Sequence, residues 1–312
     1  SLPPLTDSAW VDVTPTNNYS DNVSFEIHEV NWEATVYAFF KDTAGNISNS
    51  IKDNITLNVP FRLTDTEQTK SYTDTFGEDS DYTGIPNSFI DKGNGTVFDN
   101  NSRLMWQKKD DSIGRNWTES ITYCNNLRLA GYSDWRLPEP NEFLTIVDEK
   151  SSNLIYHIPL QTSSSSNFYS SIESKNDNSK AWHINNSRVI GIVEKYHNYL
   201  VRCVRGEKRK YNFSKHSDEL IFDQITNLTW EGNLRGTSKT WFEAINHCEN
   251  LNFGGISDWR LPNIHELASI YQRNLANSID SNFFSGLGDT WSSTNSGYSG
   301  WESFAWYANN GV

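Results

Sequence analysis

The chain has 312 residues, of which 36% are hydrophobic and 13% aromatic, and its formal net charge at pH 7 is −13. A chain of this length accommodates two or three domains with ordinary cores. Its acidic balance argues against a nucleic-acid partner, because phosphate binding requires clustered Lys and Arg side chains, and it has no run of eighteen apolar residues that would predict a transmembrane segment.

The N-terminal segment, residues 1–60, predicts an all-β module. Its stretch ATVYAFFKDTAGNISNSIKDNITLNV is typical of two antiparallel strands around a Gly-containing turn at residues 42–46. Sixty residues are few for a β-sandwich, which usually takes about 100. We therefore expect the module to be completed by residues outside this sequence or by a strand from another chain. Residues 61–88 are interpreted as a linker.

Residues 89–207 predict a domain that mixes helices with short strands. The stretch TVFDNNSRLMWQ, residues 96–107, is typical of two strands around an Asn/Asp turn. Apolar residues then recur at helical spacing, and Gly131 stands where this helix is expected to end. The apolar residues of the helix are Trp117, Ile121, Cys124 and Leu127.

The hexamer SDWRLP, residues 133–138, leads into a second amphipathic helix whose first turn begins near the proline. The later segments FYSS, AWHI and YLVRCVRG are strand candidates. The basic stretch RGEKRK, residues 205–210, is interpreted as a solvated linker that ends the domain.

The same hexamer returns at residues 257–262, so that Ser257 lies 124 residues after Ser133. The offset holds without a gap over about fifty residues and aligns the helix residue Cys124 with Cys248. Thr240 and Glu243 form a T-x-x-E capping box at the start of the repeated helix. Residues 208–312 are therefore a second copy of the domain, and the period is too long for a solenoid.

Three cysteines point to a disulfide framework. Cys124 on the first helix and Cys203 in the last strand of the first copy are expected to form a bridge that joins the ends of that domain. The partner of Cys248 is expected beyond Val312, because the offset places the counterpart of Cys203 there. Disulfides persist in oxidising compartments, which predicts a location outside the reducing cytosol.

These motifs resemble the Lcl C-terminal domain family, also known as domain of unknown function 1566. The resemblance covers residues 90–312 and includes an L-x-W start, the Trp- and Cys-containing helix, SDWRLP with a following Glu, a strand with an aromatic residue before Ser-Ser and an A-W strand, all in order and twice. The strand reads Y-S-S in the first copy and W-S-S-T in the second. The first copy also has the closing V-R-C-V-R.

The family resemblance implies an α+β fold, with two tandem C-type-lectin-like domains of two helices and a twisted antiparallel sheet. It also implies that residues 1–60 are an immunoglobulin-like module. Members of the family are secreted or attached to the bacterial surface, and some are adhesins. The family has no agreed catalytic residues, so none is carried over to this chain.

Two interpretations of the hexamer are open, a recognition or catalytic site and a packing element. Duplicated domains must both fold but need not both bind, which favours packing, with the Arg and the following Glu in a bidentate pair. The residues of this motif are Trp135, Arg136 and Glu142 in the first copy and Trp259, Arg260 and Glu266 in the second. The tripeptide EPN, residues 139–141, matches a calcium and sugar ligand of calcium-dependent lectins, but no carboxylate-rich loop accompanies it.

Candidate binding residues lie late in each copy, where aromatic rings are mixed with small polar residues as in recognition loops. They are Tyr298, Trp301, Tyr307 and Asn309 in the second copy and Tyr196 and Asn198 in the first. The chain has no H-x-x-x-H, C-x-x-C or G-x-S-x-G motif, so neither metal nor triad chemistry is predicted and we expect no enzyme.

The sequence thus favours a secreted or surface-exposed bacterial adhesin that binds a host-surface or matrix glycan or protein through its second lectin-like domain. One alternative is a structural subunit of a surface filament or pilus, whose β module is completed by a neighbouring subunit. A second alternative is a calcium-dependent lectin, and calcium is the only cofactor considered.

Overall fold

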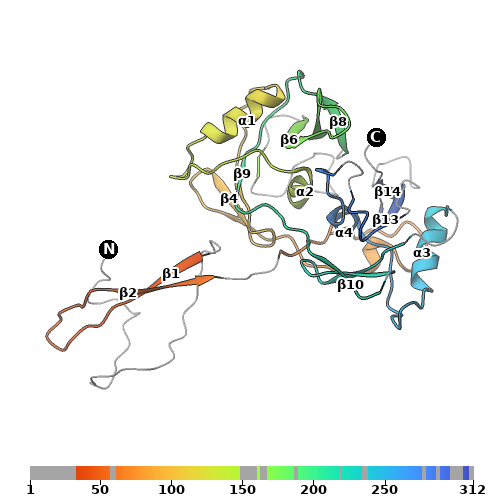
Figure 1. The fold of residues 1–312 in the computed structure, drawn as a ribbon, viewed down its shortest axis with the longest axis horizontal. Coiled ribbons are helices and arrows are strands. Elements are labelled where there is room, and N and C mark those ends of the chain that lie inside the picture. The colour runs from red at the N-terminus through yellow and green to blue at the C-terminus, as the bar shows by residue number, and fades with distance from the viewer. Residues whose placement is uncertain are drawn as a thin grey trace. The chain divides into compact units, whose positions relative to one another are not determined.

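In a computed structural model the chain forms two compact units, Ser1–Val59 and Pro60–Val312 (Figure 1). The structure describes residues 33–56, 61–147, 160–161, 167–185, 189–217, 219–233, 238–275, 279–285, 289–295 and 305–308. Of residues 33–36, 53–56 and 305–308 it describes the backbone alone.

The first unit contains the expected hairpin. Strands β1 (Glu33–Ala38) and β2 (Ile51–Thr56) pair antiparallel, with Ala38 opposite Ile51. In the turn, the carboxylate of Asp42 accepts hydrogen bonds from the backbone N–H of Ala44 at 2.9 Å and of Asn46 at 2.8 Å. Gly45 has a φ of 89°, a left-handed conformation that favours glycine. The predicted hairpin and turn are confirmed.

The first copy of the repeat has two small antiparallel sheets and two helices. One sheet has the order β3-β4-β5-β9 and the other β6-β7-β8. The strands are β3 (Phe89–Asp91), β4 (Thr96–Asp99), β5 (Met105–Gln107), β6 (Phe168–Glu173), β7 (Lys180–Ile184), β8 (Ile190–Glu194) and β9 (Val204–Arg205). The helices are α1 (Trp117–Asn126) and α2 (Pro140–Phe143), and the 3-10 turn η2 (Leu144–Ile146) extends α2.

The described part of the second copy repeats three strands, two helices and two further strands in the order of β3 to β7. Its strands are β10 (Phe213–Lys215), β11 (Leu220–Asp223), β12 (Leu228–Glu231), β13 (Thr290–Asn295) and β14 (Ala305–Ala308), and its helices are α3 (Trp241–Glu249) and α4 (Ile264–Ser269). The fold is therefore mixed helix and sheet, built mostly from small antiparallel sheets. None of the helices in the described part of the chain is long and apolar enough to cross a membrane.

Capping boxes fix the starts of the long helices. Thr240 Oγ1 accepts from the backbone N–H of Glu243, whose carboxylate accepts from the backbone N–H of Thr240, as the sequence predicts. Asn116 and Glu119 do the same for α1. The prediction that the first helix ends at Gly131 is wrong, because α1 stops at Asn126 and Gly131 lies in a separate turn with a φ of 83°.

The two copies pack against each other through their second helices, which lie side by side in Figure 1. Ala268 of α4 belongs to the same apolar cluster as Trp106 and Phe143 of the first copy. The side-chain amide of Asn141 in α2 donates to the carbonyl oxygens of Ala268, at 3.1 Å, and Tyr271, at 2.6 Å. The second unit thus has a core that continues from one copy into the other.

Residues 61–88, assigned to a linker from the sequence, are part of the second compact unit and contact the second copy. The side chain of Gln68 both donates to the carbonyl oxygen of Asn295 and accepts from its backbone N–H, at 2.6 and 2.9 Å. The Tyr82 hydroxyl donates to the Glu249 carboxylate at 2.6 Å. These contacts join residues more than 160 positions apart, which local sequence patterns do not reveal.

Asp79 of the 3-10 turn η1 (Asp79–Asp81) is buried in this contact. Its Oδ2 accepts from the hydroxyls of Thr66 and Thr294, each at 2.6 Å. Burial raises the pKa of Asp79, although these two hydrogen bonds act in the opposite direction. The folded protein therefore retains a proton on Asp79 at a pH at which the unfolded chain has lost it.

We expect Asp79→Asn to raise the free energy of unfolding at pH 7 by about 1–3 kcal/mol, because a buried charge is replaced by a neutral amide. The wild type should lose stability as the pH rises from the ordinary Asp pKa to the raised pKa of the folded state, since the unfolded chain binds fewer protons there. The variant should lack this fall. Urea unfolding of both proteins from pH 3.5 to 7 measures the difference, and a variant less stable throughout would contradict the assignment.

The interpretation of residues 205–210 as a solvated linker is wrong for both of its arginines. Arg205 forms a bidentate pair with Asp134, at 2.8 and 3.1 Å, and its guanidinium lies 3.7 Å from the centre of the Tyr132 ring. Arg209 is buried, with its guanidinium 4.8 Å from the centre of the Phe61 ring. Stacking on aromatic rings removes these charged groups from solvent, whereas the remaining residues of the stretch are exposed.

Candidate functional site

In the first copy the repeated hexamer lies between the core and the closing strand. Trp135 is 2% exposed, and its indole N–H donates to the carbonyl oxygen of Leu129 at 3.4 Å. Arg136 donates to both carboxylate oxygens of Glu142, at 2.7 and 2.6 Å, and its backbone exchanges two 2.9 Å hydrogen bonds with Val204. The predicted bidentate pair is present, and it ties the loop to helix α2 and to the closing strand.

The second copy has the same arrangement with less burial. Arg260 donates to both oxygens of Glu266, and Glu266 also accepts from the backbone N–H of Asn263 at 3.0 Å. Trp259 is half-buried and donates to the carbonyl oxygen of Phe253 at 3.2 Å. In both copies the Arg and Glu side chains are occupied with each other, which favours the interpretation of the motif as a packing element.

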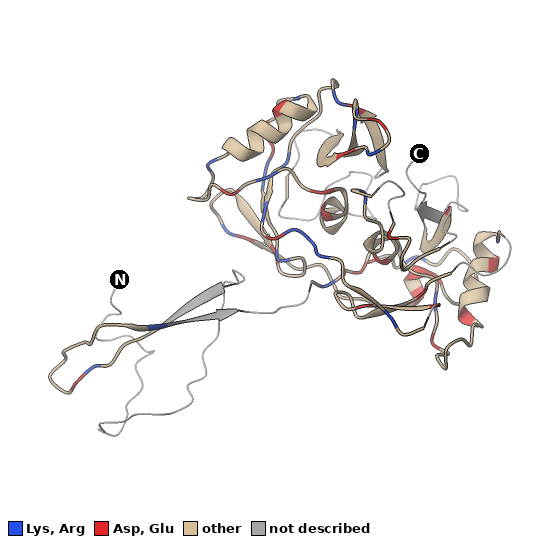
Figure 2. Cartoon of the chain, in the orientation of Figure 1, with Lys and Arg blue, Asp and Glu red and all other residues tan. Residues whose placement is uncertain are grey.

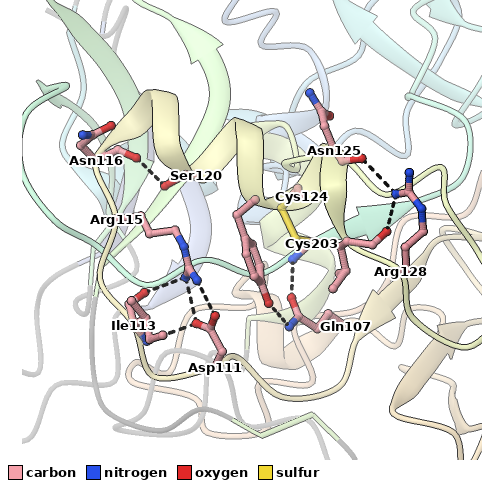
Figure 3. Close-up of a disulfide and its surroundings, with 12 residues drawn as sticks. Gln107, Asp111, Ile113, Arg115, Asn116, Ser120, Cys124, Asn125, Arg128 and Cys203 are labelled. Atoms are coloured by element: carbon pink, nitrogen blue, oxygen red, sulfur yellow. Dashed lines mark hydrogen bonds and ion pairs between the residues drawn. A yellow bond between two sulfur atoms is a disulfide. The ribbon is translucent and has the colours of Figure 1, made fainter.

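The disulfide between Cys124 and Cys203 is confirmed, with an S–S distance of 2.06 Å (Figure 3). It joins helix α1 to the segment that leads into β9, and both residues are fully buried. Cys248 is a free thiol that is partly buried on α3. Burial raises the pKa of Cys248 to about 12, so the thiol stays protonated at neutral pH and is a poor nucleophile.

The tripeptide EPN is used within the protein. Glu139 forms an ion pair with Lys208 at 2.9 Å, and Pro140 opens helix α2. Asn141 donates to the Tyr211 hydroxyl at 3.1 Å as well as to the second copy. Within the described ranges no group of three or more His, Cys, Asp or Glu side chains could hold a metal ion.

The exposed aromatic residue Tyr196 marks a surface of the first copy formed by two loops. Residues 194–199 begin at the last residue of strand β8, and residues 111–115 precede helix α1. Arg115 and Tyr199 exchange two backbone hydrogen bonds, at 2.8 and 3.0 Å, which hold the loops together. Tyr196 is 73% exposed and Ile113 is 55% exposed. We call residues 111–115 and 194–199 the Tyr196 surface.

A chain of ring contacts connects Tyr196 to the core. Its ring centre lies 4.5 Å from that of His197, which stacks on Tyr199 at 6.0 Å with an angle of 11° between the planes. Tyr199 in turn lies 4.8 Å from the buried Tyr169. The Tyr169 hydroxyl donates to the carbonyl oxygen of Glu194 at 2.6 Å, which fixes the start of the loop. The exposed ring is thus supported by ordered rings behind it.

The other loop is held by a charged pair. Arg115 donates to both carboxylate oxygens of Asp111, and its guanidinium lies 4.0 Å from the centre of the Tyr123 ring on helix α1. Figure 3 shows the pair next to the helix that bears the disulfide. The Arg115 guanidinium holds the pKa of Asp111 below its usual range, so this carboxylate stays ionised at neutral pH.

Polar groups around the exposed ring remain available to a ligand. Asn198 is exposed, and the side chains of Glu194 and His197 are both about 40% exposed, with Nε2 and Oε2 3.5 Å apart. His183, which contacts Tyr199 from below, has its pKa lowered by burial. The surface therefore offers an apolar ring beside hydrogen-bonding groups. In the chain as a whole, basic and acidic residues are interspersed along the described ribbon (Figure 2).

A family model describes both copies. The Lcl C-terminal domain matches residues 95–205 and 219–312. The chain belongs to the Lcl C-terminal domain family. The two matched regions coincide with the two copies found from the sequence repeat, and the Tyr196 surface lies entirely within the first Lcl C-terminal domain. No curated protein and no solved structure matches the chain.

The candidate residues of the second Lcl C-terminal domain are largely untested. Tyr298, Trp301 and Asn309 lie outside the described residues. Tyr307 lies in β14, where its backbone is opposite Trp291 of β13, and its side chain is outside the described set. Tyr196 and Asn198 are thus the binding candidates selected from the sequence whose side chains the structure describes.

The sequence did not identify the loop opposite Tyr196. Asp111, Ile113 and Arg115 belong to a short polar stretch that resembles any surface turn, and only the pairing of Arg115 with Tyr199 brings them to the candidate residues. Gly114 lets the loops approach, because a Cβ at this position would lie 3.3 Å from the Cβ of Asn198. Gly114 directly after the isolated apolar residue Ile113 was the one feature of the sequence that could have indicated this loop.

Proposed function

We propose that the chain is a non-catalytic binding protein, exposed on or secreted from a bacterial cell, that recognises a host-surface or matrix glycan or protein. The proposal includes C-type-lectin-like folds for the two Lcl C-terminal domains and an immunoglobulin-like module for residues 1–60. The observation that carries the proposal is the exposed ring of Tyr196 at the end of an ordered chain of aromatic rings.

This arrangement favours recognition because the ring is already positioned. A ligand that stacks on Tyr196 has little side-chain entropy to remove, since His197 contacts the ring and Tyr199 supports His197. The apolar face of a sugar ring or of a protein side chain is a suitable partner for an exposed aromatic face. Asn198 and Glu194 supply the polar contacts that orient such a ligand.

The disulfide supports an extracellular location, because such bridges are stable in oxidising compartments. The absence of catalysis is proposed from the use of the repeated hexamer residues in packing and from the raised pKa of Cys248. Recognition by the distal loops around Tyr298 and Trp301 remains part of the proposal as a second surface.

The alternative function, a subunit of a surface filament, is favoured by one observation in the first unit. The side chains of Tyr37, Phe40 and Ile51 are all exposed on or beside the β1–β2 hairpin. Exposed apolar residues beside strands are suited to pairing with a neighbouring chain. This function predicts concentration-dependent polymers that disappear in a Tyr37→Ser/Ile51→Ser variant.

A glycan and host-matrix array, probed with the full chain with and without chelator, tests the main proposal. Tyr196→Ala should weaken binding at least tenfold, or about 1.4 kcal/mol, because it removes the exposed ring. It should leave the melting temperature unchanged, since most of the ring is in solvent. The matched control is Phe242→Ala, which removes a 45% exposed ring from helix α3 of the second copy.

Each outcome on the array is decisive for one function. Binding that survives Tyr196→Ala and is lost in a Tyr298→Ala/Trp301→Ala variant would transfer recognition to the second copy. Loss of binding with chelator alone would support the calcium-dependent lectin. Absence of binding together with filament formation would replace the proposal by the structural subunit.

A further inference from the structure

A small pocket lies where four segments of the second unit meet. It is lined by residues of the 61–64 segment, of α2 and η2 in the first copy, of the connection between the copies and of α4. Its volume is about 20 Å³, which is sufficient for one water-sized or small ionic group. None of its ten lining residues is Asp or Glu, whereas Arg62, Arg209 and His265 are basic.

Arg209 is the unusual group in the pocket. Its side chain is 6% exposed, and no described residue accepts a hydrogen bond from it; Nε and Nη2 are both buried without a partner. These two nitrogens form the edge of the guanidinium that binds carboxylates and other anions with two parallel hydrogen bonds. An arginine stays charged in proteins, so a buried guanidinium without acceptors is costly.

The nearest carboxylate does not satisfy this edge. Asp223 Oδ2 lies 3.8 Å from Arg209 Nη2, beyond hydrogen-bonding distance. Its oxygens already accept from the Thr226 hydroxyl at 2.8 Å and from the backbone N–H of Ile225 at 2.9 Å. Asp223 therefore holds its own turn and forms an ion pair with Arg209 without accepting a hydrogen bond from it. Phe61 and Tyr211 cover the guanidinium with ring faces.

His265 brings a second unpartnered nitrogen to the pocket. Its Nδ1 lies 3.0 Å from the carbonyl oxygen of Thr64, which can only accept, so Nδ1 carries a proton. Nε2 is buried and has no hydrogen-bond partner within the described ranges. The imidazolium form would donate from Nε2 as well. The pocket thus combines an unsatisfied guanidinium with an imidazole from the other copy, and Arg62 adds an exposed guanidinium to its lining.

We infer that this pocket binds one small monovalent anion, either the carboxylate group of a short organic acid or a chloride ion. Arg209 donates to the anion, and His265 lies on the opposite copy. A cation is disfavoured by the two arginines, and a water molecule would give the guanidinium edge a hydrogen-bond acceptor that carries no charge. Because residues 61–64 and both copies line the pocket, the bound anion stabilises the packing of these three parts against one another.

The test is a titration of the full chain with sodium formate or with sodium chloride, at constant ionic strength maintained with a bulky sulfonate salt. The readouts are the melting temperature and the NMR signal of the Arg209 Nε–H group. We expect both to change saturably with one of the two salts. Saturation by formate alone would identify the ligand of the pocket as a carboxylate group, and saturation by chloride alone would identify it as a chloride ion. Saturation by both salts would show that the pocket recognises the negative charge rather than the shape of the anion.

Two variants and a control connect the effect to the pocket. Arg209→Gln should weaken binding at least tenfold, whereas Lys210→Gln, which removes the same charge from an exposed neighbour, should leave the affinity within twofold. If Arg209→Gln does not fold, His265→Asn replaces it, because the amide can still donate to Thr64 while Nε2 is removed. An unsaturable response to both salts, or equal affinity in the variants, would overturn the inference and leave a water-filled pocket.

Discussion

Replacing Cys203 by Ser should lower the free energy of unfolding of the second unit by about 2–5 kcal/mol. The bridge to Cys124 spans 79 positions, so it removes a large amount of conformational freedom from the unfolded chain. Both cysteines are also fully buried beside Trp135, and the serine hydroxyl would leave a polar group there. Urea unfolding of the two proteins, followed by tryptophan fluorescence, measures the loss.

The third cysteine provides the control for this experiment. Cys248→Ser should have a much smaller effect, because its thiol is only partly buried and forms no bridge. A reducing agent should destabilise the wild type and the Cys248→Ser variant alike, and should leave Cys203→Ser unchanged. Equal sensitivity of all three proteins to the reducing agent would contradict the assignment of the stabilising bridge.

The elements within each copy were predictable because they depend on local patterns. The helix at α1 follows from apolar spacing and from its cap, and the strands at β4 and β5 follow from alternation around an Asx turn in which Asp99 accepts from the backbone of Asn101. The repeat doubled the evidence, since the same pattern had to satisfy both copies. The disulfide followed from the same placement of Cys124 and Cys203.

The contacts between distant segments were not predictable in this way. Residues 61–88 are polar and lack periodicity, so the sequence gives no sign that Gln68 will pair with the backbone of β13 or that Asp79 will be buried between two threonines. Arg209 illustrates the same limit. In a basic stretch it resembles a solvated residue, and only the positions of Phe61 and Tyr211 explain its burial.

Of the two loops that form the Tyr196 surface, one could be predicted from the sequence. Tyr196 and Asn198 were selected by composition, which reports the residue types that recognition surfaces favour. The loop at residues 111–115 was not selected, because its position depends on the pairing of Arg115 with Tyr199. The ring chain through His197 and Tyr199 likewise depends on tertiary packing, since alternate residues of an irregular loop have no fixed orientation.

The second large effect on stability is expected from breaking the ion pair between the arginine of the repeated hexamer and the glutamate that follows it. Glu142→Ala should destabilise the second unit by about 3–5 kcal/mol, because it leaves the largely buried guanidinium of Arg136 without its carboxylate. Burial is the largest single influence and lowers the pKa of Arg136, but the hydrogen bonds to Glu142 together with the charges of Glu142 and Glu139 outweigh it, so the pKa is raised. After the substitution, the carbonyl oxygen of Gly206 still accepts from this guanidinium, at 3.2 Å, and Glu139 still attracts it, but neither replaces the bidentate carboxylate.

The equivalent change in the second copy, Glu266→Ala, is the matched comparison and should cost about 1.5–3 kcal/mol. Arg260 is 30% exposed against 19% for Arg136, so water can replace more of the lost hydrogen bonds. Urea unfolding of both variants should rank them in this order.

A packing role also predicts that Arg136→Met combined with Glu142→Leu costs less than Glu142→Ala alone, because no unpaired charge is left buried. If Glu142→Ala instead kept full stability and abolished ligand binding, the hexamer would be a recognition site, and its duplication would then mean two sites in one chain.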